Sequence, residues 1–462
     1  MRCLQAVRAA MAAAHGLRRA VPVERACAAL IAGMLLTPAW ALDLRQAYEA
    51  AEQNDASIRA SRAAANAARE KLPQAKAQRL PNLSFNAAAN RNNLKTSTET
   101  IQGPRTLVNS YNSNNQVLQL RQPIYRPYLS ALVDQAQAQV ENADASLESD
   151  EQSLVQRVSE AYFDALLARV QKELIATQKA AYAAQLDAAQ KSFKAGSGVR
   201  TDIDEAQARV DMSQAQELEA AQNVEFTRRR LEVLTGKTID VLADLDMASF
   251  RPELPGPDKL EEWIAKAEAA NPQLRALQAQ LEASRMEIDK AKAGHKPTLD
   301  AVASVSRSDS DSVTSVNTVY NQKFIGVQLS IPLYSGGYVN STVRQAVADS
   351  ERAREALEAA RRDLGSKVYE QYRAVTEGVL RVAALEQAVR SAEQAVRSSR
   401  KSFAAGGRTT VDVLNAEQQH TTALRDLAQA RYMFLLSRIR LQVLAGQDRW
   451  ASIDQANASL TR

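Results

Sequence analysis

Two short stretches of the sequence place a carboxylate just after a basic, glycine-containing turn. The first, KSFKAGSGVRTDID, begins at Lys191, and the second, KSFAAGGRTTVDV, begins at Lys401. A carboxylate that follows such a break either caps the next helix or stays available to attract a cation. The glycines that can take positive φ and reverse the chain here are Gly196, Gly198, Gly406 and Gly407.

Asp202 and Asp412 occupy equivalent positions after these two turns. One interpretation is that both act only as helix N-caps, helped by Thr201 and Thr409, because Ser, Thr and Asp favour that position. The other is that their carboxylates serve a site at the turns. The residues alone leave both interpretations open.

The sequence shows no pattern of an enzyme. Beyond the N-terminal segment the only histidines are His295 and His420, and neither has an acid or a nucleophile at motif spacing. Carboxylates are spread along helical stretches, where pairing with Arg one turn away accounts for most of them. There is no phosphate-binding glycine-lysine motif. We expect no catalytic residue, no cofactor and no metal site.

The N-terminal 41 residues read as a signal peptide. An Arg-containing region precedes the apolar run ACAALIAGMLL and the small residues of TPAWA, so cleavage is expected after Ala41, with Met11 as an alternative start. Cys3 and Cys27 leave with this segment, and the mature chain has no thiol chemistry. Five Arg and one Glu leave as well, which brings the net charge of +5 close to neutrality and gives no argument for nucleic-acid binding.

The mature chain is a tandem duplication, because matched segments recur in one order at a nearly constant offset. The matched pairs are KAQRLPNLSFNA with KAGHKPTLDAVA, LQLRQPIY with VQLSIPLY, and RRLEVLTGK with IRLQVLAGQ. The predicted units are residues 42–246, a proline-containing linker at 247–259, a second repeat at 260–446 and a tail at 447–462. Each repeat reads helix, strand, strand, very long helix, turn, long helix.

Heptad spacing predicts packed helices about 65–70 residues long, or on the order of 100 Å. Val133, Val140, Leu147 and Leu154 step by seven in the first repeat. Val375, Val382, Val389 and Val396 do so in the second. Such a stripe is first of all a packing surface.

Alternating stretches of about ten residues predict four strands, each with one apolar face, separated in pairs by polar loops. The predicted loops are NLKTSTETIQGPRTLVNSYNSNN and DSDSVTSVNTVYN. This pattern suits an outer-membrane barrel, but it also suits a half-buried soluble sheet. Four strands cannot close a barrel, which takes at least about 8. Either the sheet is soluble, or three chains together supply twelve strands.

This order of parts resembles the TolC family of outer-membrane channel-tunnel proteins over essentially the whole mature chain. The segments that carry the resemblance are GHKPTLDAVAS, IPLYSGGYVNSTVRQA, AAGGRTTVDVLNA and ARYMFLLSRIRLQVLAG. The resemblance implies a mainly α fold with a small β part, in which long helical hairpins form a periplasmic α-barrel. It also implies a homotrimer whose twelve strands form a β-barrel in the lipid of the Gram-negative outer membrane.

The resemblance further implies an exit duct, docked through a periplasmic adaptor to an inner-membrane ABC, RND or MFS transporter, that exports proteins or small molecules. The cargo stays open. The alternative from a different class is a secreted or periplasmic coiled-coil protein without a pore.

By the same resemblance the helix tips hold a gate. Asp412 lines a constriction, Asn415 stands where the family often has a second Asp, and Phe403 replaces a tethering Tyr. Arg408 is expected to tether the inner hairpin to Thr201 and Asp202 of a neighbouring chain. The implied adaptor-docking tips are Gly196, Ser197, Gly198, Gly406 and Gly407.

Overall fold

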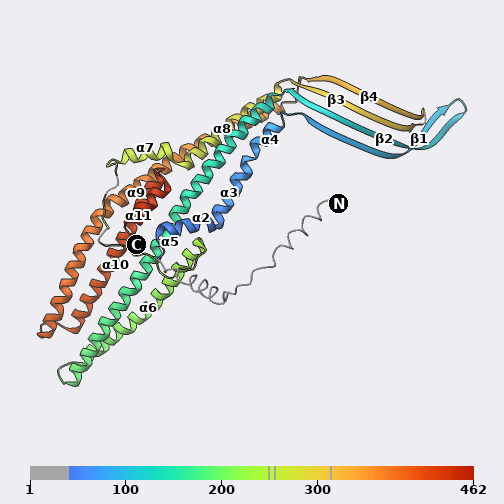
Figure 1. Cartoon of the computed structure of the whole chain (residues 1–462). Helices are drawn as coiled ribbons and strands as arrows, with labels where there is room; N and C mark the ends of the chain where they lie inside the picture. Colours follow the sequence, from blue (N-terminus) through green and yellow to red (C-terminus); the bar gives the residue numbers. More distant parts are fainter. Residues whose placement is uncertain (1–40, 248–249, 254–255, 313–314, 462) are drawn as a thin grey trace, which may run out of the picture.

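The computed structural model describes residues 41–247, 250–253, 256–312 and 315–461. Apart from Ala41, the predicted signal peptide lies outside these residues, as does part of the predicted linker. A four-stranded sheet occupies one end of an elongated molecule, and two helical hairpins end together at the other (Figure 1). The predicted gate and the predicted membrane sheet therefore lie at opposite ends of the chain's long axis.

Two antiparallel helical pairs build most of the length. The first pair is α5 (Pro127–Lys194) with α6 (Arg200–Thr235), and the second is α9 (Tyr338–Ala404) with α10 (Thr410–Leu444). The remaining helices are α2 (Leu44–Asn54), α3 (Ala56–Arg69), α4 (Lys71–Ala77), α7 (Leu260–Ala270), α8 (Pro272–Lys292), the short 3₁₀ helix η1 (Ala293–His295) and α11 (Arg449–Asn457).

The predicted heptad stripes are buried in part, with Val133, Val140, Leu147 and Val389 only half-buried in the single chain. Leu154 of α5 is fully buried, and so are Val375 and Val382 of α9, because a repeat of seven keeps these side chains on one face of a long helix. At 1.5 Å per residue, the 68 residues of α5 extend for about 100 Å. The prediction of rod-like hairpins is confirmed.

The sheet has the strand order β1-β2-β3-β4, and every neighbouring pair is antiparallel. Its strands are β1 (Asn82–Thr100), β2 (Gly103–Tyr125), β3 (Thr298–Ser312) and β4 (Ser315–Ser330). The central pairing joins β2 of the first repeat to β3 of the second, with Leu118 opposite Val305. Strands β1 and β4 are left as edges.

The predicted strand lengths were wrong. The polar segment expected as a loop after Asn92 is strand, and β1 pairs with β2 up to Thr100 opposite Gly103. The apolar alternation stops well before that point, but the backbone ladder continues without it. Thr, Asn and Ser side chains support the ladder across the strands, as in the contact between Ser97 Oγ and Thr106 Oγ1 at 3.0 Å.

The main core lies in the middle of the molecule, where α2, α11 and the residues after α6 pack on the two long hairpins. Tyr162 of α5 is fully buried, and its hydroxyl donates to the carbonyl oxygens of Leu42 and Ala243. Burial raises the pKa of this phenol far above its ordinary value. The core holds the two hairpins together in the middle of the molecule, and the hairpin tips extend away from it.

Within the described residues, no helix is long and apolar enough to cross a membrane. The fold class inferred from the sequence, duplicated long helical hairpins plus four strands in each chain, is confirmed.

Candidate functional site

The two helix tips share one backbone turn. Gly196 has φ 77° and Gly406 has φ 76°, a region that side-chain-bearing residues rarely adopt. In each turn the next amide closes back by five residues, from Ser197 N to Ser192 O at 3.0 Å and from Gly407 N to Ser402 O at 2.8 Å. Both helices therefore end in a Schellman-type cap.

Only the first glycine of each turn uses positive φ, so the expectation for Gly198 and Gly407 was wrong. Gly198 is constrained in another way, because a Cβ there would lie 2.8 Å from Phe193 N. Close approach of the backbone, and not its handedness, therefore requires glycine at this position.

The helices that follow the turns begin differently. In α10 the hydroxyl of Thr409 accepts from Asp412 N at 3.3 Å, and a carboxylate oxygen of Asp412 accepts from Thr409 N at 2.9 Å. This reciprocal pair is a capping box. In α6 the N-cap is Val199, whose side chain offers no acceptor. Asp202 stands at the position of Asp412 but makes no capping bond.

Asp412 is thus the N3 residue of the capping box and not the N-cap itself. The backbone and hydroxyl hydrogen bonds from Thr409, with Arg408 nearby, hold the pKa of the Asp412 carboxyl below its usual range. The group stays ionised near neutral pH. A negative charge in the first helical turn also suits the helix dipole.

Arg408 bends back onto its own hairpin, where Nη1 donates to the buried hydroxyl of Ser399 at 3.0 Å. Thr201 and Asp202 lie on the first turn of α6, Thr201 exposed and Asp202 half-buried. Phe403 is half-buried at the end of α9. The single chain brings Arg408 and Asp412 to the same tip, but it forms no bond between Arg408 and Asp202.

The two hairpins contact each other just behind the tips. Tyr182 of α5, Ala206 of α6 and Leu414 of α10 form a small buried cluster. Beside it, Arg209 of α6 donates to Asn415 Oδ1 at 3.2 Å and to Gln418 Oε1 at 2.7 Å, both on α10. These contacts hold the α9–α10 hairpin against the α5–α6 hairpin.

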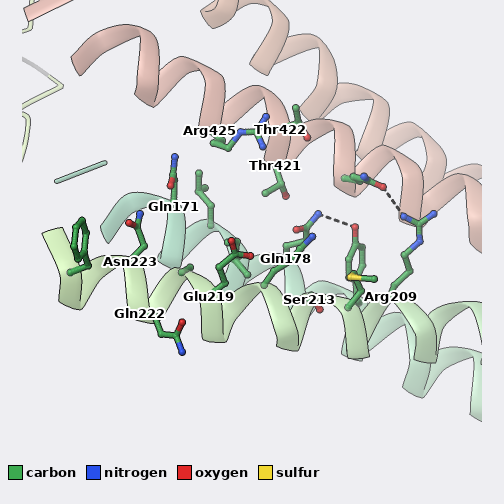
Figure 2. A pocket seen from close by; sticks show the side chains of 18 residues that line it. Gln171, Gln178, Arg209, Ser213, Glu219, Gln222, Asn223, Thr421, Thr422 and Arg425 are labelled. Atoms are coloured by element: carbon green, nitrogen blue, oxygen red, sulfur yellow. Dashed lines mark hydrogen bonds between the residues drawn. The ribbon is translucent and has the colours of Figure 1, made fainter. Parts of the chain in front are cut away.

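A groove of about 710 Å³ opens next to this contact, between α5, α6 and α10 (Figure 2). Amide and hydroxyl side chains dominate its lining, with Arg209 and Arg425 as the cations. The sequence analysis assigned no role to Arg209. Arg209 lies seven residues after Asp202 and therefore on the same face of α6. This spacing is the sequence signal that could have indicated its role.

At the other end, the sheet presents one apolar face that the chain itself leaves uncovered. Ile325 is 87% exposed and Val327 is 70% exposed. Val327 lies opposite Ala301, so the two positions share this face, whereas Gln328 lies opposite Asp300 on the polar face. Members of the apolar face on the other two strands are Leu83, Phe85, Leu118 and Leu120.

Two features of the sheet base were not found from the sequence. Asp300 is almost fully buried and accepts from Arg121 at 2.6 Å and from Arg126 at 2.7 Å. This cluster ties β2 and the start of α5 to β3. The second feature is a set of exposed tyrosines where strands meet helices, namely Tyr125, Tyr128, Tyr334 and Tyr338. Such aromatic residues typically mark a membrane–water boundary.

The described residues contain no cluster of side chains able to hold a metal ion. At the tips Asp412 serves a capping box and Asp204 pairs with Arg200, and the groove beside them has an amide-rich lining.

Comparisons with known proteins agree with this geometry. Residues 47–237 and 263–447 match the family described as outer membrane efflux protein. The chain is 33% identical to the alkaline protease secretion protein AprF of Pseudomonas aeruginosa, over 89% of this chain and 86% of that protein. It is 30% identical to the outer membrane protein TolC of Vibrio cholerae, over 93% and 96%.

Solved structures show the same fold. The outer membrane protein VceC of Vibrio cholerae superposes with a TM-score of 0.73 at 19% identity, over 87% of this chain and 96% of that one. CusC, whose structures concern transmembrane channel formation, superposes with a TM-score of 0.76 at 14% identity, over 88% and 92%. This is a family of channel proteins and not of enzymes. The chain belongs to the outer membrane efflux protein family and is an outer-membrane exit duct with a periplasmic helical tunnel.

Proposed function

We propose that three copies of the chain assemble into the working duct, with one twelve-stranded barrel in the outer membrane. The observation that carries this proposal is the pair of free sheet edges, β1 and β4, on a sheet with an exposed apolar face. In hydrocarbon every backbone amide and carbonyl needs a partner, so an open sheet is not stable there. Pairing β4 of one chain with β1 of the next satisfies both edges.

Exposed apolar side chains along the hairpins support the same assembly. Met212, Phe226 and Val233 of α6 are 61%, 69% and 65% exposed, and Leu380 of α9 is 71% exposed. Their own hairpins leave them exposed, and Met212 and Phe226 line the groove beside the hairpin contact, so a neighbouring chain is their natural cover.

The helix tips then form the periplasmic gate. Arg408 tethers the inner hairpin to Thr201 and Asp202 of a neighbour, in place of its contact with Ser399. Asp412 supplies one ring of three carboxylates. Asn415, engaged by Arg209, adds no charge, and Phe403 adds no hydroxyl. The closed state therefore depends on Arg408 more than on an aromatic tether.

The same tips, Gly196–Gly198 and Gly406–Gly407, are the docking points for a periplasmic adaptor, which connects the duct to an inner-membrane ABC, RND or MFS transporter. Secreted proteins are the cargo that the relatives favour. AprF is named an alkaline protease secretion protein, and PrtF of Dickeya chrysanthemi, 31% identical over 88% of this chain, is named a proteases secretion protein. Small molecules are the second class of cargo, because another relative, BepC of Brucella suis, is named an outer membrane efflux protein.

We retain the division of the chain into 42–246, 247–259, 260–446 and 447–462. The recurrence of helices, two strands and a long hairpin in the same order supports this division.

Native mass spectrometry in detergent tests the assembly, with a trimer as the expected result. Val327→Arg should impair membrane insertion at a cost of about 2–4 kcal/mol near the bilayer midplane, because this side chain faces lipid. Gln328→Arg, on the polar face, is the matched control and should assemble. A stable bilayer-inserted monomer, or equal assembly of the two variants, would overturn the proposal.

A further inference from the structure

The apolar face of the sheet has two different borders. At the helix end it is bounded by the exposed tyrosines Tyr125 and Tyr334. Along β3 and β4 the opposite border is cationic. Arg307 lies two residues beyond Val305 on the same face of β3, and Lys323 lies two residues before Ile325 on the same face of β4, farther from the helices. The described aromatic residues near that border, including Tyr320 and Phe324, fall on the polar face by alternation.

Arg307 and Lys323, here called the outer cation pair, are close neighbours. Lys323 of β4 lies directly opposite Val305 of β3. Val305 is two residues before Arg307 on the same strand, so Lys323 and Arg307 are diagonal neighbours. Arg307 itself lies opposite Asn321 on one side and Gln116 on the other. The two cations are thus flanked by two amide side chains that can also donate hydrogen bonds.

Neither cation is neutralised within the described chain. Arg307 and Lys323 are exposed, and neither forms an ion pair or side-chain hydrogen bond with another described residue. Asp309 lies on the same face two residues beyond Arg307. The group keeps a net positive charge with this carboxylate included.

The height of the pair matches a lipid headgroup layer. From Leu299 to Arg307 the strand rises through eight residues, about 26 Å along its axis. With the usual tilt of outer-membrane strands, this corresponds to roughly 20 Å along the barrel axis, close to the height of a lipid-facing apolar band. The cations therefore end the band on the side away from the periplasmic helices.

We propose that the outer cation pair, with Asn321 and Gln116, binds the phosphate groups of phosphorylated lipid headgroups in the outer leaflet. Arg offers a planar fork suited to two phosphate oxygens, and Lys adds a second point charge. At the tyrosine border the cations Arg121 and Arg126 are engaged by Asp300, and this border suits the interface of the periplasmic leaflet. This inference rests on the proposed membrane barrel and names the lipid chemistry that its outer border recognises.

The test measures lipid binding by the full-length mature trimer in detergent, using native mass spectrometry. The probe is diphosphorylated lipid A, compared with its dephosphorylated form and with inorganic phosphate. Each cation near an anionic surface contributes about fivefold in affinity, so Arg307→Gln with Lys323→Gln should weaken lipid A binding about 30-fold. Arg307→Lys should retain most of the binding.

Arg105→Gln with Arg390→Gln is the matched control, since it removes two exposed charges elsewhere and should leave lipid A binding unchanged. Binding of lipid A by the Arg307→Gln/Lys323→Gln variant at the level of the original protein would overturn the inference. So would equal binding of dephosphorylated lipid, or phosphate binding that needs no lipid. Trimer formation and conductance of the same samples are measured separately. If the unsubstituted protein formed no trimer or conducted no ions, the proposed trimeric duct would be contradicted and not only the lipid-binding inference.

Discussion

The two hairpin tips have nearly the same backbone but different polar contacts. The turns at Gly196 and Gly406 have φ values one degree apart and the same closing hydrogen bonds. After the turn, α10 begins with the Thr409–Asp412 capping box, whereas α6 begins at Val199 without one. Duplication has kept the shape of the tip while changing which side chains are free to contact another chain.

The difference assigns separate roles to two equivalent carboxylates. Asp412 is committed to its own helix through one oxygen and keeps its charge. Asp202 has no capping duty, so it is available to the Arg408 of a neighbour. Arg408 itself occupies the position of Gly198 in the other tip, so only one tip of each chain carries the cation that we propose as the tether.

Removing the tethering cation should have the largest effect. Arg408→Ser deletes the charge-assisted contact that we propose for the closed state, worth about 1.5–3 kcal/mol, so it should raise the open population by at least about tenfold. Single-channel conductance in planar bilayers measures this while the trimer stays intact. Arg425→Ser, farther along α10, is the control. An unchanged conductance in Arg408→Ser would show that the tip is only a helix end.

Making the first tip resemble the second should have an intermediate effect. Val199→Thr places a hydroxyl at the N-cap, three residues before Asp202, and creates the capping box that α6 lacks. The added cap should stabilise the helix by about 1 kcal/mol. Asp202 then becomes tied to its own backbone and competes less well for Arg408, so conductance should rise modestly.

Val199→Ala is the control for Val199→Thr, because it shortens the side chain without adding an acceptor. Equal conductance in the Thr and Ala variants would indicate that Asp202 is not the partner of Arg408.

The charge of Asp412 should set ion selectivity. Its folded-state pKa is lowered, so its stabilising contribution is present above the unfolded pKa and is lost as pH falls through the folded value. Cation preference should therefore persist to a pH below the ordinary titration range of Asp. Asp412→Asn keeps an acceptor for the cap and removes the charge, so reversal potentials should lose cation preference with little loss of stability.

Adding Asn415→Asp to the Asp412→Asn variant should restore the lost cation preference, because it places a new carboxylate one helical turn away from position 412. Failure to restore it would contradict the assignment of the ring to this face of α10.

The heptads of α5 and α9 were predictable because a period of seven in one segment fixes the buried face. The extent of the strands was not, since the backbone ladder from Asn92 to Thr100 continues without an apolar pattern.

The site was predictable only in part. Turn glycines and the following Asp residues are local signals. The bonds of Arg209 to Asn415, and of Asp300 to Arg121 and Arg126, join residues far apart in sequence and depend on how the elements pack.

The smallest effect should come from the feature that the tips share. Gly196→Ala and Gly406→Ala each force a side chain into positive φ, with no neighbouring atom within 4 Å of the added Cβ. The cost is therefore conformational, about 1 kcal/mol, and should be the same at both tips. Chemical denaturation of the trimer measures it. Because the first tip holds the free Asp202 and the second holds the capping box, unequal costs would mean that their different polar contacts already strain the turns. Equal costs would leave the backbone as the common scaffold and the side chains of Val199, Thr409 and Arg408 as the source of the difference.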